Sequence, residues 1–125
     1  MDVMTTGVSR YDAESGEKAD AIITCGGGEL MCEVVPYIDF EKIASSEPKW
    51  YMGYSDNTNY TFLSTILADT AAIYGPCAPA FGRDPWHESI TDALKLLTGE
   101  KTEFTSYDLW EKNEISAEEE ARIAL

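Results

Sequence analysis

Apolar residues gather in three short runs along the chain, each of which ends at glycine. The runs are residues 19–25 before Gly26, Gly27 and Gly28, residues 49–53, and residues 71–74 before Gly75 and Pro76. Short apolar runs bounded by glycine are typical of strands buried on both faces, as in a parallel sheet. The pattern therefore predicts three buried strands.

Between and after these runs, apolar residues recur at helical spacing. The two clearest cases are a helix from Thr58, with Phe62, Leu63, Ile66 and Leu67, and a helix over 89–97, with Ile90, Ala93, Leu94 and Leu97. Thr98-Gly99 is a plausible stop for the second helix. Shorter helices are expected over residues 30–37 and 39–44, the latter with Asp39 as N-cap. Strands that alternate with helices predict an α/β fold with an open, mostly parallel sheet and flanking helices.

The two ends of the chain lack this periodicity. Residues 1–18 are polar and are expected to form an irregular lead-in. Residues 103–107 are a candidate edge strand, and residues 111–125 form an acidic tail, either a frayed helix or the start of a linker. The folded domain is therefore expected to span residues 19–110.

The net charge limits the classes of partner that the chain is expected to bind. Nine basic residues face 23 acidic ones, a net charge of −14. Such a chain repels nucleic acid and anionic lipid, because both are bound through Lys and Arg. No apolar run approaches the roughly 20 residues of a membrane span, and the N-terminus lacks the features of a signal peptide. The cytoplasm is the expected compartment.

Cys25, Cys32 and Cys77 show neither a disulfide framework nor zinc-site spacing, so no metal or cofactor is expected.

In open α/β sheets, ligands bind beyond the carboxyl ends of the strands. The glycine-marked ends of the three predicted strands are therefore expected to line one site. The candidate lining residues are Gly26, Gly27, Gly28, Tyr54, Gly75 and Pro76. Cys25 also stands at a strand end, where it is expected to pack as a small apolar residue.

Ser55 stands between the second predicted strand and the following helix. This position resembles a nucleophile elbow, in which a serine on a tight turn faces nearby backbone N–H groups. The N–H groups of Asp56 and Gly27 are the candidate oxyanion donors. Spacing alone favours another reading, in which Ser55 or Asp56 caps the helix. The full G-x-S-x-G pattern is also not met, because Asn57 replaces the second glycine.

His87 is the only histidine and lies in a Pro-rich loop. A serine nucleophile needs a base, so His87 is a candidate for that role, with a surface loop histidine as the alternative.

Several blocks in a fixed order resemble the LD-carboxypeptidases, including the microcin C self-immunity peptidases. The blocks read AIITCGG, VVPYIDF, PKWYMGYSDNT and YGP, and the resemblance extends over roughly residues 19–110. It implies a Rossmann-like or flavodoxin-like N-terminal domain of a serine peptidase. It also implies Ser55 as nucleophile, with an oxyanion hole formed by the Asp56 N–H and the Gly27 region.

The resemblance implies a small peptide substrate with a free carboxylate, derived from peptidoglycan or similar to a microcin. In this family the serine is activated by a His and a Glu from a C-terminal domain. Because no matching pair follows here, and no first family strand is expected ahead of residue 19, the domain is expected to be incomplete. The chain alone is expected to show little activity and to act as a homodimer or with a C-terminal domain. The alternatives are a non-catalytic peptide-binding or assembly module and a degenerate fragment.

Overall fold

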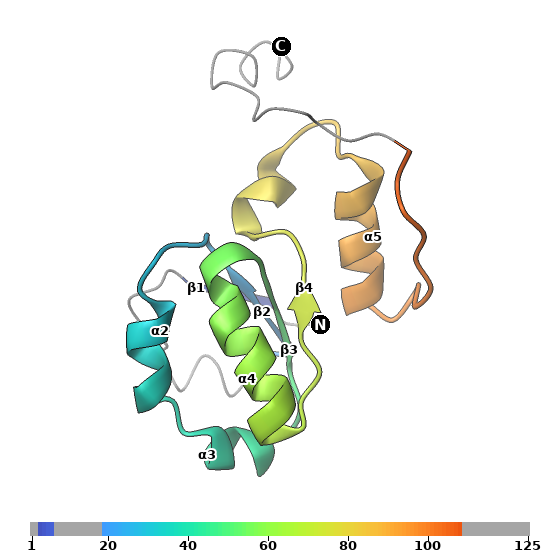
Figure 1. The fold of residues 1–125 in the computed structure, drawn as a ribbon. Helices are drawn as coiled ribbons and strands as arrows, with labels where there is room; N and C mark the ends of the chain where they lie inside the picture. Colours follow the sequence, from blue (N-terminus) through green and yellow to red (C-terminus); the bar gives the residue numbers. More distant parts are fainter. Residues whose placement is uncertain (1–2, 7–18, 109–125) are drawn as a thin grey trace. The chain divides into compact units, whose positions relative to one another are not determined.

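The computed structural model describes residues 3–6 and 19–108, and the chain divides into two compact units at residues 81 and 82. The first unit contains a four-stranded parallel sheet in the order β1-β2-β3-β4 (Figure 1). Its strands are β1 (Val3–Thr6), β2 (Ala21–Thr24), β3 (Trp50–Gly53) and β4 (Ile73–Tyr74). The predicted α/β class with an open parallel sheet is confirmed.

The centre of the sheet is buried as the apolar runs predicted. All four residues of β2 are buried, and Met52 on β3 has no exposed surface. Burial on both faces is typical of parallel strands between helices. Ala21 pairs with Trp50 and Ile23 with Met52, which brings the ends of β2 and β3 side by side.

Within residues 19–108, four helices and short 3-10 turns connect and follow the strands. In the first unit these are α2 (Met31–Val34), η1 (Val35–Tyr37), α3 (Phe40–Ala44), η2 (Ser55–Asn57) and α4 (Thr58–Ala68), and η3 (Ala78–Gly82) includes the residues at which the two units divide. The predicted cap of α3 is confirmed, since the Asp39 carboxylate accepts a hydrogen bond from the Lys42 N–H at 2.9 Å.

Helix α4 contacts β3, β4, α2 and α3, and its Tyr60 ring stacks with Phe40 of α3 and lies against Tyr51 of β3. Thr61, Ser64 and Ala68 are buried, whereas Phe62 is 61% exposed and Ile66 and Leu67 are exposed as well. The spacing of apolar residues in the sequence predicted this helix correctly but not which of its faces is buried. Small side chains let the helix lie close to the sheet, and the Ser64 hydroxyl is satisfied by the Thr61 carbonyl at 3.1 Å.

The second unit contains α5 (Glu88–Leu97), which buries Ile90, Ala93 and Leu97. The predicted stop is confirmed: Thr98 is the C-cap, and Gly99 follows with φ of +73°. Glycine adopts this left-handed conformation without the steric cost that a Cβ carries.

Two expectations about the flanks differ from the structure. Val3–Thr6 is a strand that pairs in parallel with β2, where an irregular lead-in was expected, and residues 7–18 and 109–125 lie outside the described residues. The predicted edge strand over 103–107 is wrong, because no strand forms there. This segment contacts α5 instead, because the Tyr107 hydroxyl donates a hydrogen bond to Asp92 on that helix.

Candidate active site

Ser55 occupies a strained turn between β3 and α4. Tyr54 continues the strand in extended conformation, and Ser55 then adopts φ of +61°. A non-glycine residue at positive φ costs about 1–3 kcal/mol and is found preferentially at functional sites. A strand, a strained serine and a helix in this order form the geometry of a nucleophile elbow.

The alternative reading of Ser55 as a helix cap does not fit the structure. Neither η2 nor α4 begins with a side-chain cap, and none of the described residues hydrogen-bonds to the Ser55 hydroxyl. Asp56 does act as a cap, but for another helix: its Oδ2 accepts the N–H of Met31, the first residue of α2, at 2.8 Å. Ser55 is exposed, and its hydroxyl makes no hydrogen bond with the described part of the chain.

The glycine turn after β2 lies directly against Ser55. A Cβ placed on Gly27 would come within 2.9 Å of Ser55 Cβ, 3.0 Å of Ser55 Oγ and 3.7 Å of the Asp56 nitrogen. Only a residue without a side chain fits this contact. The structure thus brings together Gly27, Ser55 and Asp56, the three residues that sequence reasoning assigned to nucleophile and oxyanion hole.

Asn57 joins the two turns and was not singled out as a site residue from the sequence. Asn57 is 2% exposed. Nδ2 donates to the Gly26 carbonyl at 2.8 Å and to the Tyr54 carbonyl at 3.0 Å, and Oδ1 accepts the Tyr51 hydroxyl at 3.3 Å. Burial raises the pKa of Tyr51, with Tyr60 and Cys77 adding to the effect, so this hydroxyl stays a neutral donor.

Comparison with known proteins assigns this arrangement to a family. Residues 11–75 match the model of the LD-carboxypeptidase N-terminal domain, which is more than half of the chain. The chain belongs to this family. The match includes both turns and ends at Gly75. No curated protein and no solved structure gives a significant match.

Membership in the LD-carboxypeptidase family supports a peptidase-type function in general. The matched segment begins eight residues before residue 19, where the resemblance was expected to start, and it ends well before residue 110. The family domain therefore includes part of what was expected to be a lead-in.

The other predicted lining residues differ in how close they lie to Ser55. Tyr54 precedes it and is 48% exposed, and a Cβ on Gly28 would lie 3.5 Å from Asp56 Oδ2. Gly75 instead bonds to the Gly53 carbonyl, and a Cβ there would meet Met52 and Ile73. Gly75 thus packs against the sheet core, and Pro76 follows it.

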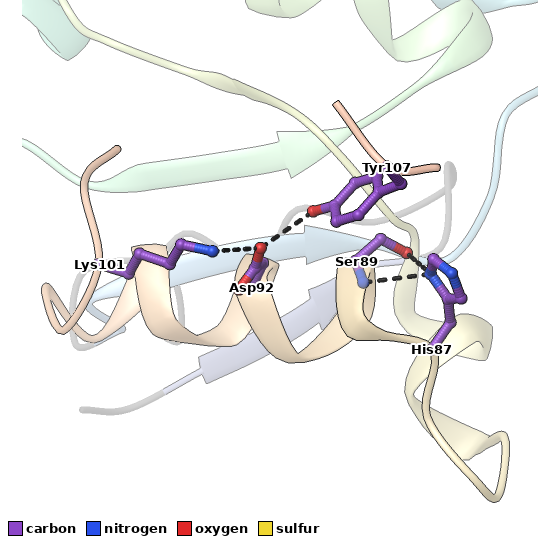
Figure 2. A network of polar contacts seen from close by, with 5 residues as sticks. All are labelled: His87, Ser89, Asp92, Lys101 and Tyr107. Carbon is purple, nitrogen blue, oxygen red and sulfur yellow. Dashed lines mark hydrogen bonds and ion pairs between the residues drawn. The ribbon is translucent and has the colours of Figure 1, made fainter. Parts of the chain in front are cut away.

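His87 serves as the N-cap of α5 (Figure 2). Its Nδ1 accepts the Ser89 N–H at 3.2 Å and lies 2.9 Å from the Ser89 hydroxyl. Because Nδ1 is an acceptor, the proton of the neutral ring is on Nε2. A histidine that activates a serine needs the opposite tautomer, with a free Nε2 lone pair. This arrangement fits a structural histidine.

Further contacts hold the segment after α5 to that helix (Figure 2). Lys101 Nζ lies 2.6 Å from Asp92 Oδ2, and the Tyr107 hydroxyl donates to the same oxygen at 3.2 Å. The hydrogen bond from Lys101 holds the pKa of Asp92 below its usual value, and the bond from Tyr107 contributes. Burial raises the pKa of Tyr107, and the Asp92 carboxylate adds to the shift.

Other candidate chemistry is limited within the described residues. They contain no group of His, Cys, Asp and Glu suited to a metal ion. Cys25 and Cys32 are exposed and Cys77 is buried, so the expectation that Cys25 packs as a small apolar residue is wrong. The turn into glycine carries Cys25 out of the sheet core. No described helix has the length and apolar character that crossing a membrane requires.

Proposed function

We propose that the chain is the nucleophile-bearing domain of a serine-type carboxypeptidase, with Ser55 as the nucleophile. The observation that carries this proposal is the positive φ of Ser55 on a turn packed against Gly27. Strain of this kind persists only where the surrounding structure imposes it, and here it presents a hydroxyl that makes no structural hydrogen bond among the described residues.

The proposed reaction is acyl transfer. Ser55 Oγ attacks the carbonyl carbon of an amide, and the oxygen of the tetrahedral intermediate accepts hydrogen bonds from the N–H groups of Asp56 and Gly27. The carbon–nitrogen bond then breaks, and the amine leaves with a proton. Water attacks the resulting ester, releases the acid and returns the proton to Ser55.

We propose that the base for Ser55 lies outside the described residues. The single histidine of the sequence is engaged as a helix cap through Nδ1. The resemblance implies that a His and a Glu come from a C-terminal domain. We therefore propose that the 125 residues alone acylate slowly, because members of a catalytic triad act as a unit.

The substrate class follows from the family. We propose a small peptide whose scissile amide lies near a free carboxylate, derived from peptidoglycan or similar to a microcin. With a net charge of −14, binding such a carboxylate requires a local positive group. A homodimer or an added C-terminal domain is the proposed source of the missing groups.

Covalent labelling tests the nucleophile. The chain is incubated with a fluorophosphonate, and the modified residue is located by mass spectrometry. Slow labelling confined to Ser55, lost in Ser55→Ala and retained in Ser45→Ala, is expected; Ser45 is an exposed serine outside the site. Labelling that is unchanged in Ser55→Ala contradicts the proposal. Rapid labelling with peptide turnover by the chain alone contradicts the requirement for an added base.

A second candidate function is a non-catalytic peptide-binding module. The observation that favours it is the role of His87, the single histidine of the sequence, which caps α5 through Nδ1. The test measures binding of a peptide that ends in a D-amino acid, and turnover of that peptide when the purified chain is supplied with the family C-terminal domain. Binding that is unchanged in Ser55→Ala, together with no turnover, supports this candidate over the peptidase.

A further inference from the structure

Asn57 uses its whole side-chain amide to join its own turn to the glycine turn 31 residues earlier in the chain. Both N–H bonds of Nδ2 are donated, one to the Gly26 carbonyl and one to the Tyr54 carbonyl, and Oδ1 accepts the Tyr51 hydroxyl. A buried amide with every strong bond satisfied holds a single orientation, because any rotation leaves a buried polar group unpaired.

The two carbonyls that Asn57 binds belong to two particular peptide planes. A peptide group is planar and trans, so fixing the direction of its C=O fixes its N–H in the opposite direction. The Gly26 carbonyl shares a plane with the Gly27 N–H, and the Tyr54 carbonyl shares a plane with the Ser55 N–H. Asn57 therefore sets the direction of the Gly27 N–H and one of the two planes that define the positive φ of Ser55.

We infer that Asn57 is a positioning residue, which orients the Gly27 N–H and the Ser55 turn for reaction at the Ser55 hydroxyl. This inference rests on the proposed function of Ser55. Asn57 touches neither substrate nor the reacting atoms; it acts through the two peptide planes. Only a side chain with two donors and one acceptor at this reach satisfies all three partners.

Asn57→Asp is the sharpest variant, because it keeps the shape and the acceptor but replaces the two-donor nitrogen with an oxygen that repels both carbonyls. Asn57→Ser is the second variant; it is too short to reach both carbonyls and suits a helix start. Ile73→Ala serves as the control for lost stability, since Ile73 is buried on β4 and bonds to neither turn. All are made in the full chain.

Two measurements separate positioning from folding. Fluorophosphonate labelling, in which Ser55 Oγ forms a bond to phosphorus as fluoride leaves and the hydroxyl proton passes to solvent, is resolved into a binding constant and a maximal rate constant. Two-dimensional NMR follows the Gly27 and Asp56 amide signals. We expect both Asn57 variants to lower the maximal rate constant about 10-fold to 100-fold with the binding constant little changed, since small misplacement has effects of this size. The Gly27 amide signal is expected to move as well.

Ile73→Ala is expected to lower the melting temperature while leaving the rate constant and the Gly27 signal as in the wild type. A folded Asn57 variant with the wild-type rate constant overturns the inference, and the proposed function survives. Equal labelling of wild type and Ser55→Ala overturns the proposed function and this inference with it. If Asn57→Asp does not fold, the same outcomes are read from Asn57→Ser. If neither variant folds while Ile73→Ala does, the role of Asn57 is structural and the inference fails.

Discussion

The backbone of Gly27 lies so close to Ser55 that a methyl group at position 27 would stand 2.9 Å from Ser55 Cβ. Real Cβ atoms essentially never approach so closely, so the two turns fit together only because one of them carries glycine. This contact holds the turns that follow β2 and β3 against each other.

Gly27→Ala is expected to push the two turns apart. Overpacking of this kind costs about 1–3 kcal/mol of unfolding free energy. We expect the labelling rate of Ser55 to fall by at least about 10-fold, because the donor at position 27 moves away from the reacting oxygen. Gly26→Ala is the matched control, since a Cβ there meets no atom within 4 Å. Equal labelling of the two variants would show that close packing at position 27 has no part in reactivity.

Ser55→Gly is expected to stabilise the chain relative to Ser55→Ala. Both variants remove the hydroxyl, but only glycine adopts φ of +61° without a steric penalty. The difference in unfolding free energy is expected to be about 1 kcal/mol, measured by urea denaturation of the two variants. If alanine proves equal or better at this position, the turn is not strained in solution.

His87→Ala is expected to weaken α5 without changing the chemistry of Ser55. Loss of an N-cap costs about 1 kcal/mol, whereas His87→Asn, which restores a capping side chain, should recover most of it. Thermal unfolding measures the first effect and fluorophosphonate labelling the second. A loss of labelling in both variants would instead identify His87 as the base of Ser55.

The contact of Asp92 with Lys101 and Tyr107 is expected to depend on pH. The folded pKa of Asp92 is lowered, so its stabilising contribution is present above the ordinary pKa of an aspartate and is lost as the pH falls through the lowered folded value. NMR signals of the Tyr107 ring should therefore shift toward those of an unstructured tyrosine only in acid. In Asp92→Asn this transition should disappear; its persistence would place the titrating group elsewhere.

The sheet was predictable where the sequence carries an unambiguous local signal. The apolar runs before Gly26 and Gly75 identified β2 and β4, although only Ile73 of the second run is buried, and Asp39 identified the start of α3. Capping and glycine termination depend on neighbouring residues, so the sequence carries them locally. The short strand Val3–Thr6 could not be predicted, because its two threonines give no apolar run and its pairing with β2 is a long-range contact. Residues 103–107 are the opposite case. Their side chains favour a strand, but the segment pairs with no described strand and does not form one.

The candidate site was predictable in part for the same reason. Ser55, Asp56 and Gly27 lie at strand ends, where ligands bind in such sheets, and ordered family blocks surround them. Asn57 escaped notice because an asparagine at a helix start is usually a cap. Its actual partners are the carbonyls of Gly26 and Tyr54, one of them 31 residues away. Only the pairing of β2 with β3 brings those groups within its reach.

The backbone of Ser55 also has an evolutionary consequence. Serine and glycine codons can differ by one nucleotide, and in this conformation glycine is the more stable residue. A lineage selected for folding alone would therefore accept glycine at position 55, because selection removes only the mutations that bring stability below the threshold that function needs. Selection for the hydroxyl, and not for stability of the fold, would retain a serine at this position.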